Sequence, residues 1–315
     1  MTRLYVEGWA PEYGAPVEPD EVLAPSEGTV DLDVEGRPWE PVPGADDGVP
    51  EIAFVDGVRR IDARLLLDDP EDGPTPGVCG SYAVGAVVWD RDRRVSRYEG
   101  IRVERVAVLL GGKRATLPAM PPSLTYRPES VADPDPAALV RHVHGAMRRA
   151  EAALVDRLAG DGTAVVADGP LYETAVRAET IGYIKSHRVS YLPGEPGRIL
   201  GRLAAGERTP LFTIKGYERY SWYVRLADRD GAHAWHGLVR CEAPAALGRD
   251  GAVRLADRSA AVLPSVGSEP HLDPRAPQNL VPIGALEREL RHRLGDPGFV
   301  LRELRRAVTR EGAAA

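Results

Sequence analysis

The sequence predicts a mixed α/β protein, in which a mixed sheet is flanked by helices and preceded by an irregular acidic segment. Three observations lead to this prediction. Three apolar segments of β type follow one another without an intervening helix, a long amphipathic helix comes next, and a short apolar strand ending in Asp-Gly follows that helix. With 315 residues, 43% of them hydrophobic, the chain is long enough to bury a large core.

Residues 1–49 are expected to form an extension with little core of its own, ahead of one domain over residues 50–315. Residues 1–50 hold twelve acidic side chains against only Arg3 and Arg37, and they are rich in Pro and Gly. The remaining 265 residues hold 38 basic and 35 acidic side chains. The net charge of −7 therefore comes from the extension, and the mildly basic body remains compatible with a nucleic-acid partner.

Several classes of protein do not fit this sequence. It contains no run of eighteen or more apolar residues, so we expect no membrane-spanning segment, and the first residues lack the apolar core of a signal peptide. The two cysteines, Cys79 and Cys241, are too few for a disulfide framework. These features predict a cytoplasmic protein. The phosphate-binding pattern GxxxxGK[ST] is also missing, so ATP-driven movement would need a partner.

The first three strands are expected at residues 52–67, 82–89 and 101–110. The first of them has a short apolar part that ends in Asp56-Gly57 and a β-type continuation up to Leu67. Turn residues separate the three segments. Consecutive strands without an intervening helix pair with each other in antiparallel fashion.

A helix with well-marked ends follows these strands. Asp135 can cap its N-terminus, Pro136 suits the first helical position, and Gly160 and Gly162 end it. The next strand, over residues 163–169, is expected to return beside the first strand. The apolar residues of the helix recur at steps of three and four: Leu139, Val143, Met147, Ala150, Leu154 and Leu158.

The remainder of the chain predicts a second group of strands and a helical end. The aromatic residues of segment 217–223 have basic neighbours, which suits stacking on single-stranded nucleic acid, but alternating aromatic residues in a strand favour a core position. The expected elements are strands at 181–192, 211–214, 221–226 and 235–241, a short helix at 198–205, and mostly helix over 276–308 with a break near Gly295.

Three acidic residues are candidates for chemistry. Asp56 and Asp168 each end a short strand of buried type, and Glu151 lies on the apolar stripe of the helix, four residues after Met147. If the two strands are neighbours, the three carboxylates converge. Carboxylates in such a place are costly unless a cation offsets them, and their oxygens favour Mn²⁺ or Mg²⁺, the ions of phosphoryl transfer. Each residue alone also has an ordinary explanation, since Asp-Gly is common in turns and a Glu at the stripe edge can reach water.

The order strand-Asp, two strands, helix-Glu, strand-Asp is the ribonuclease-H-like arrangement, and the residues that form it resemble the NurA nuclease domain. The resemblance covers roughly residues 50–290. Its motifs are Phe54-Val55-Asp56-Gly57, Glu151 placed seventeen residues before Asp168, and Val166-Ala167-Asp168-Gly169-Pro170, with support from Ile181-Gly182-Tyr183-Ile184-Lys185-Ser186.

This resemblance implies a DNA nuclease dependent on Mn²⁺ or Mg²⁺, with single-strand endonuclease and 5′-to-3′ exonuclease activity. Asp56, Glu151 and Asp168 would be its catalytic metal ligands. It also implies a homodimer that works with a hexameric HerA-type ATPase in the resection of double-strand breaks. The Tyr and His that the family places near the last helix have no matching pair here, and in the corresponding stretch His271 or Asp273 could supply a fourth ligand.

Basic residues close to the acids are candidates for DNA binding. Arg59 and Arg60 follow the first aspartate, and Lys185 and Arg188 follow the second, although a solvated strand face explains them equally well. Two other functions stay open. One is a non-catalytic ribonuclease-H-like adaptor that binds DNA or an ATPase, and the other is a metal-dependent phosphatase for small phosphoesters. Binding of Mn²⁺ at the acids separates the nuclease from the adaptor.

Overall fold

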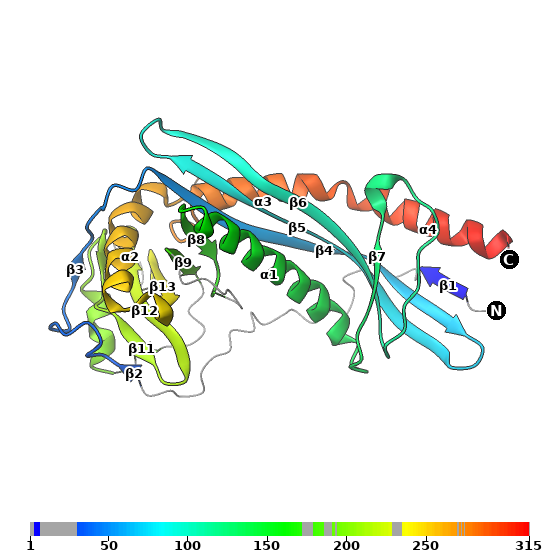
Figure 1. The fold of residues 1–315 in the computed structure, drawn as a ribbon, viewed down its shortest axis with the longest axis horizontal. Coiled ribbons are helices and arrows are strands. Elements are labelled where there is room, and N and C mark those ends of the chain that lie inside the picture. Colours follow the sequence, from blue (N-terminus) through cyan, green and yellow to red (C-terminus); the bar gives the residue numbers. More distant parts are fainter. Residues whose placement is uncertain are drawn as a thin grey trace.

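The structure is a computed structural model that describes residues 3–6, 30–171, 179–185, 191–192, 194–228, 235–269, 271, 273 and 275–314. It is a mixed α/β protein with one large mixed sheet packed against several helices, as predicted (Figure 1). Among the described residues, no helix is both long enough and apolar enough to cross a membrane.

The elements follow in chain order. The strands are β1 (Arg3–Val6), β2 (Val30–Asp31), β3 (Val42–Pro43), β4 (Glu51–Asp69), β5 (Gly73–Asp90), β6 (Val95–Leu109), β7 (Arg127–Ser130), β8 (Ala164–Asp168), β9 (Thr180–Ile184), β10 (Glu207–Arg208), β11 (Phe212–Ile214), β12 (Tyr217–Arg225) and β13 (Leu238–Pro244). The helices are α1 (Ala137–Gly160), α2 (Arg249–Val262), α3 (Val281–Leu294) and α4 (Pro297–Ala314), with short 3₁₀ turns η1 (Pro122–Leu124), η2 (Pro196–Gly201), η3 (Ala245–Leu247) and η4 (Leu263–Val266).

Three long strands form the spine of the molecule (Figure 1). β4, β5 and β6 pair antiparallel in sequence order, which confirms the prediction, and each is longer than expected. Their two faces are covered by different helices: β4 packs Ala53 and Val55 against α1, and Val58 against α3. Because helices cover both faces of this part of the sheet, its strands can carry apolar residues at consecutive positions.

The helix and strand that follow the spine are those predicted. The backbone N–H of Ala137 donates to the carboxylate of Asp135, but α1 begins one residue later than predicted, with Pro136 at the N-cap position instead of the first helical position. β8 pairs parallel with β4, and β9 pairs parallel with β8. Because β4, β8 and β9 run in the same direction, β8 and β9 end at the same edge of the sheet.

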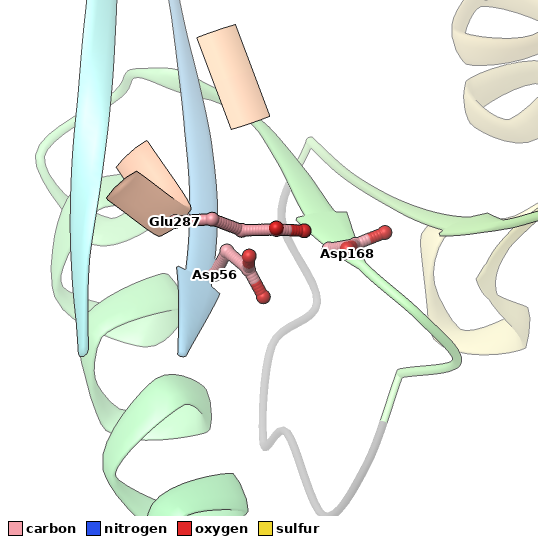
Figure 2. Close-up of side chains that lie close together, drawn as sticks. All are labelled: Asp56, Asp168 and Glu287. Carbon is pink, nitrogen blue, oxygen red and sulfur yellow. The ribbon is translucent and has the colours of Figure 1, made fainter. Parts of the chain in front are cut away.

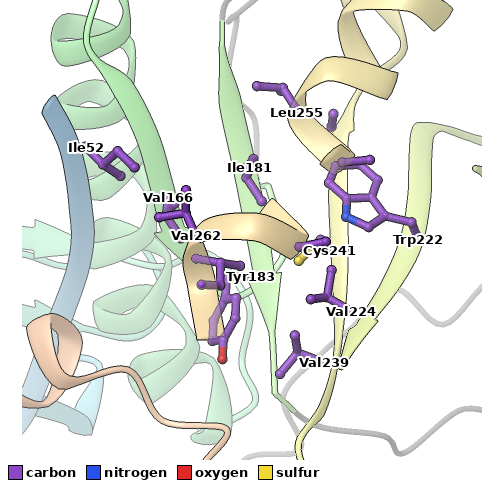
Figure 3. Packing of buried hydrophobic residues seen from close by; sticks show 14 of the residues in the cluster. Ile52, Val166, Ile181, Tyr183, Trp222, Val224, Val239, Cys241, Leu255 and Val262 are labelled. Atoms are coloured by element: carbon purple, nitrogen blue, oxygen red, sulfur yellow. The ribbon is translucent and has the colours of Figure 1, made fainter. Parts of the chain in front are cut away.

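The second half of the sheet runs from β9 through β13 and β12 to β11, and α2 packs over it. Figure 3 shows the core between these strands and α2, with Trp222 and Tyr183 fully buried. Tyr223 is buried too, so the core position expected for the aromatic strand is confirmed for these side chains. The strand predicted at 181–192 is shorter in the structure: β9 ends at Ile184, and Lys185, Tyr191 and Leu192 are not in a strand. Residues 186–190 lie outside the described part. The helix predicted at 198–205 is the 3₁₀ turn η2.

The described part of the acidic extension is held on the body by ion pairs. Arg208 is fully buried and donates to both Glu35 and Asp257, and the buried Arg258 pairs with Asp47. The short strands β2 and β3 also join the sheet by pairing with β11 and β10. Residues 30–49 thus lie on the body, and two short strands of this segment add to its sheet.

The C-terminal helices pack along the spine and are broken at residues 295–296, as predicted. Gly295, with φ of 79°, ends α3 in the left-handed region. Helix α4 covers the far end of β4, where Val300 and Leu304 pack near Leu65. The N- and C-terminal elements β1 and α4 thus lie side by side at this end of the molecule (Figure 1).

Candidate metal centre

Three acidic side chains meet where β4, β8 and α3 come together. One carboxylate oxygen each from Asp56, Asp168 and Glu287 lies within 4.8 Å of the other two, and Figure 2 shows the three side chains approaching from these elements. Asp56 and Glu287 are buried, and Asp168 is largely buried. Among the Asp, Glu, His and Cys residues that the structure describes, these three offer ligand atoms close enough together to share one metal ion.

Strand register brings the two aspartates together. Phe54 pairs with Val166 and Val55 with Ala167, so the next step of the register places Asp168 beside Asp56. Asp168 is the last residue of β8, as predicted. The expectation that Asp56 also ends a strand was wrong, because β4 continues to Asp69. The parallel neighbour β8 ends beside Asp56, so the carboxylates of Asp56 and Asp168 both lie at the carboxyl end of β8.

Glu287 was not among the predicted site residues. It lies on α3, four residues after Ile283 and three before Leu290, and both of these side chains are fully buried. Glu287 has the same three- and four-residue spacing from apolar neighbours that identified Glu151 on the earlier helix, so this pattern predicts that Glu287 is buried too. Packing of α3 on Val58 holds the glutamate above the two aspartates.

Glu151 faces the sheet as predicted, but it lies outside the group of three. It is buried on α1, which covers the opposite face of β4 from α3. Gly57 makes room for it, because a Cβ at position 57 would overlap Glu151 Oε1. Glu151 is nevertheless close enough to Asp56 to disfavour ionisation of that carboxyl.

Burial and mutual repulsion change the protonation of these acids. Burial raises the pKa of Asp56 well above its usual range, and the charges of Asp168 and Glu151 raise it further. Burial also raises the pKa of Asp168, although Lys185 opposes the shift. Burial raises the pKa of Glu151 to about 7, with Arg148 opposing. Ionising all of these carboxyls together is therefore unfavourable in the protein alone, and a divalent cation would favour their ionised forms.

Two basic side chains pair with the acids. Lys185 Nζ lies 2.6 Å from Asp168 Oδ2 and 3.1 Å from Asn279 Oδ1. Arg275 donates from Nη1 and Nη2 to the two oxygens of Glu287, each at 3.1 Å. The other oxygen of Asp168, Oδ1, is buried and accepts no hydrogen bond from the described residues. A buried carboxylate oxygen without a donor is the kind of atom that a metal ion satisfies.

The two residues proposed as a fourth ligand lie outside the group of three. His271 is 69% exposed and pairs with Glu269. Asp273 accepts hydrogen bonds from Arg275 and from Asn279 Nδ2, the latter at 2.6 Å. Despite the opposing effect of burial, the Arg275 guanidinium lowers the pKa of Asp273 to about 2. Asp273 is thus part of a hydrogen-bond chain that surrounds the acids.

The candidate DNA-binding residues occupy different surroundings. Lys185 touches the acid group directly, whereas Arg59 Nε lies 3.4 Å from His144 Nδ1 on the side of α1. Arg60 donates to Asp62 and to the backbone carbonyl of Leu294 at the end of α3, which gives it a structural role. Arg188 lies outside the described residues.

A cavity opens beside the acids between α1 and the end of β8. Arg148, Glu151 and Asp168 are its charged lining residues, with Val55 and Leu171 among the apolar ones. Glu151 and Asp168 both line this cavity, which has room for a water molecule beside them.

The donor set fits a hard divalent cation. The three side chains offer only carboxylate oxygen, which suits Mg²⁺ and Mn²⁺ rather than a softer metal. A scan against protein-family models found no match for the chain, and a search of curated proteins found no relative.

Proposed function

We propose that the protein is a metal-dependent DNA nuclease in which Asp56, Asp168 and Glu287 hold Mn²⁺ or Mg²⁺. The main support is the close approach of three carboxylate oxygens in a largely buried place. The buried oxygen of Asp168 that lacks a donor supports it independently. Three carboxylates this close repel each other unless a cation or protons neutralise them.

The topology supports a ribonuclease-H-like fold for this enzyme. Three antiparallel strands, β4 to β6, are followed by the short strand β7, which pairs with β6, then by α1 and by β8, which is parallel to β4. The aspartates on the first and fourth of these strands are the ones that the NurA-like motifs contain. The fold and the motifs thus favour phosphodiester hydrolysis over other metal chemistry, as an argument by likeness.

The protein's own side chains would divide the work. Asp56, Asp168 and Glu287 would hold the ion, which when bound supplies Lewis-acid stabilisation of charge on the phosphodiester. Glu151, with a pKa of about 7 and access to the cavity, can accept a proton near neutral pH. Lys185 lies 2.6 Å from Asp168 and would contact a DNA phosphate next to the ion.

The resemblance to NurA also suggests the partners. We propose that the enzyme acts on single strands and duplex ends as a homodimer, together with a HerA-type hexameric ATPase, in end resection. The body of the chain is only mildly basic. A dimer or an ATPase ring would therefore supply much of the affinity for DNA, because linked sites bind a long polymer more tightly than one site does.

A nuclease assay tests this proposal. End-labelled single- and double-stranded DNA would be incubated with the full chain in Mn²⁺, Mg²⁺ or EDTA. Cleavage is expected with a metal and lost in EDTA and in Asp168→Asn and Glu287→Gln. The matched control is Glu289→Gln, two residues further along α3, where the glutamate pairs only with Arg293 among the described residues. Cleavage that survives in both site variants would refute the proposal.

One observation favours a non-catalytic adaptor as the second candidate. Lys185 and Arg275 already pair with Asp168 and Glu287, so protein cations alone offset part of the charge. An adaptor with this arrangement would bind DNA or an ATPase and would not bind Mn²⁺ at the acids.

A chromogenic phosphomonoester in the same assay series separates the phosphatase alternative from a diesterase.

A further inference from the structure

Arg275 lies between two carboxylates and binds both of them. Its Nη1 and Nη2 donate to the two oxygens of Glu287, each at 3.1 Å. On the other side, its Nε and Nη2 donate to Asp273 at 3.2 and 3.1 Å, and its backbone N–H donates to Asp273 at 2.7 Å. The guanidinium therefore has two anionic partners, one inside the acid group and one outside it.

The two partners of Arg275 differ in what else holds them. Asp273 is fixed by Asn279 Nδ2 at 2.6 Å and has a lowered pKa, so it remains an ionised partner of the arginine. Glu287 belongs to the group of three carboxylates, and its other described basic neighbour, Arg291, is 66% exposed and lies 3.4 Å away. Loss of the bond to Glu287 would therefore leave the guanidinium attached to Asp273.

We infer that Arg275 is a phosphate-binding residue of the site, released from Glu287 when a divalent cation takes that carboxylate. Asp273 then holds the guanidinium in place while its freed N–H groups bind a phosphate of the DNA. This inference rests on the proposed nuclease function. It assigns Asp273 the role of a positioning residue instead of a metal ligand.

Charge and geometry both favour this exchange. A cation held by Glu287 would compete with Arg275 for that carboxylate and would repel its positive charge. The planar fork that fits a carboxylate also fits two oxygens of a phosphate. The side chain of Arg275 is 50% exposed, so a polyanion can reach it from solvent. Lys185 is held in a similar way, between Asp168 and Asn279.

Calorimetry on the full chain tests the inference without measuring cleavage. Mn²⁺ is titrated into the wild type and Arg275→Gln, and thymidine 5′-phosphate, which has no diester, is then titrated into the Mn²⁺-loaded proteins. Because a competing ion pair is lost, Arg275→Gln is expected to bind Mn²⁺ about two- to fivefold more tightly. Because a charge-assisted fork is lost, it is expected to bind the nucleotide about tenfold more weakly.

Two further variants complete the design. Arg275→Lys keeps the charge without the fork, so its Mn²⁺ affinity should stay near the wild type while its nucleotide affinity still falls. Arg293→Gln removes an exposed arginine of α3 that pairs with Glu289, and both affinities should stay unchanged. Thermal melts of each variant establish that it is folded.

Opposite changes in the two affinities distinguish the inference from a structural role. If Arg275 only holds Glu287 in position, Arg275→Gln weakens Mn²⁺ binding, and the inference is overturned. Unchanged nucleotide binding overturns it too. A wild-type chain with no saturable Mn²⁺ binding refutes the proposed function along with it. Binding of Mn²⁺ that depends on Asp168 but ignores Arg275 refutes this inference alone.

Discussion

Two buried aspartates on strand β4 have opposite surroundings. Asp62, 2% exposed, accepts hydrogen bonds from Arg60 Nε at 2.7 Å, from Tyr126 at 2.8 Å and from Ser81. Asp56, 8% exposed, accepts a bond from the backbone N–H of Gly57 at 2.8 Å and otherwise faces other carboxylates. The same residue type on the same strand is thus surrounded by donors at one position and by acids at the other.

The comparison shows that neighbours decide what a buried carboxylate does. The network around Asp62 also fixes the end of α3, because Arg60 and Arg105 both donate to the carbonyl of Leu294. It has a complete set of protein partners and needs no ion. Among the described residues, Asp56 accepts a hydrogen bond from Gly57 and has Lys185 as a partial counter-charge, but its other charged neighbours are acids. Burying like charges together costs stability unless a cation binds. Burial alone does not separate the two cases.

The largest expected effect is on cleavage. Asp56→Asn should reduce metal-dependent DNA cleavage about a thousandfold, on the order of 4 kcal/mol in activation free energy, because a ligand of the ion is lost. Asp62→Asn should leave the rate per folded molecule within about threefold of the wild type, since Asp62 touches structural partners only. Initial rates on a labelled oligonucleotide, corrected for the folded fraction, measure both. Equal losses in the two variants would remove the distinction between the aspartates.

The next largest effect is on stability, where Asp62→Asn should be more harmful than Asp56→Asn. Asp62→Asn should lower the free energy of unfolding by about 3 kcal/mol, because Arg60 and Arg105 lose their buried counter-charge. Asp56→Asn should leave the metal-free protein unchanged or more stable by about 1 kcal/mol, since it removes repulsion. Urea unfolding in EDTA gives both values. A strongly destabilised Asp56→Asn would show that Asp56 is structural.

The pH dependence of stability tests the acid site. Glu151 has a pKa of about 7 in the fold, against 4.5 for an ordinary glutamate, so the folded state binds more protons than the unfolded state between these values. Its contribution to stability is therefore present below pH 4.5 and is lost as pH rises to 7, a decrease of about 3 kcal/mol. Asp56 and Asp168 act in the same direction, while Arg148 opposes the shift of Glu151.

The substitution Glu151→Gln should therefore flatten the stability curve in EDTA between pH 4.5 and 7. Urea midpoints at several pH values, for the wild type and the variant, measure the difference. Parallel curves would mean that Glu151 titrates normally in the folded chain.

The smallest expected effect concerns Arg60. Arg60→Gln should lower the free energy of unfolding by about 1 kcal/mol, because donors to the last carbonyls of α3 and to Asp62 are lost. DNA affinity, measured by fluorescence anisotropy, should change less than twofold. Unchanged stability with a clear loss of DNA affinity would instead support the contact with DNA predicted from sequence.

The fold was predictable from sequence where local patterns are strong. Helix α1 and the strands β4 and β8 carry long periodic or apolar runs with clear ends, and the parallel pairing of β4 with β8 follows from their order. Helix α2 was missed because four of its eight buried residues are Ala or Ser, a fifth is Gly, and one of the three large ones is the charged Arg258. Small residues give little hydrophobic contrast, and only packing against β12 and β13 reveals their face.

The site was predictable only in part for a related reason. Asp56 and Asp168 follow from the strand pattern, but Glu287 enters from a helix that is distant in sequence, and its place depends on how α3 packs. The chain from Lys185 through Asn279 and Asp273 to Arg275 depends on tertiary contacts in the same way. The spacing of apolar residues in one helix predicts that Glu287 is buried, but no local pattern predicts which acidic residues it lies beside.

The most direct test of the proposed metal site is the binding of Mn²⁺ to the full chain, measured by calorimetry in the wild type, Asp56→Asn and Asp62→Asn. We expect saturable binding in the wild type, its loss in Asp56→Asn, and binding close to wild type in folded Asp62→Asn. Absence of saturable binding in the wild type, or equal binding in Asp56→Asn, would contradict the claim that these three carboxylates form a metal site.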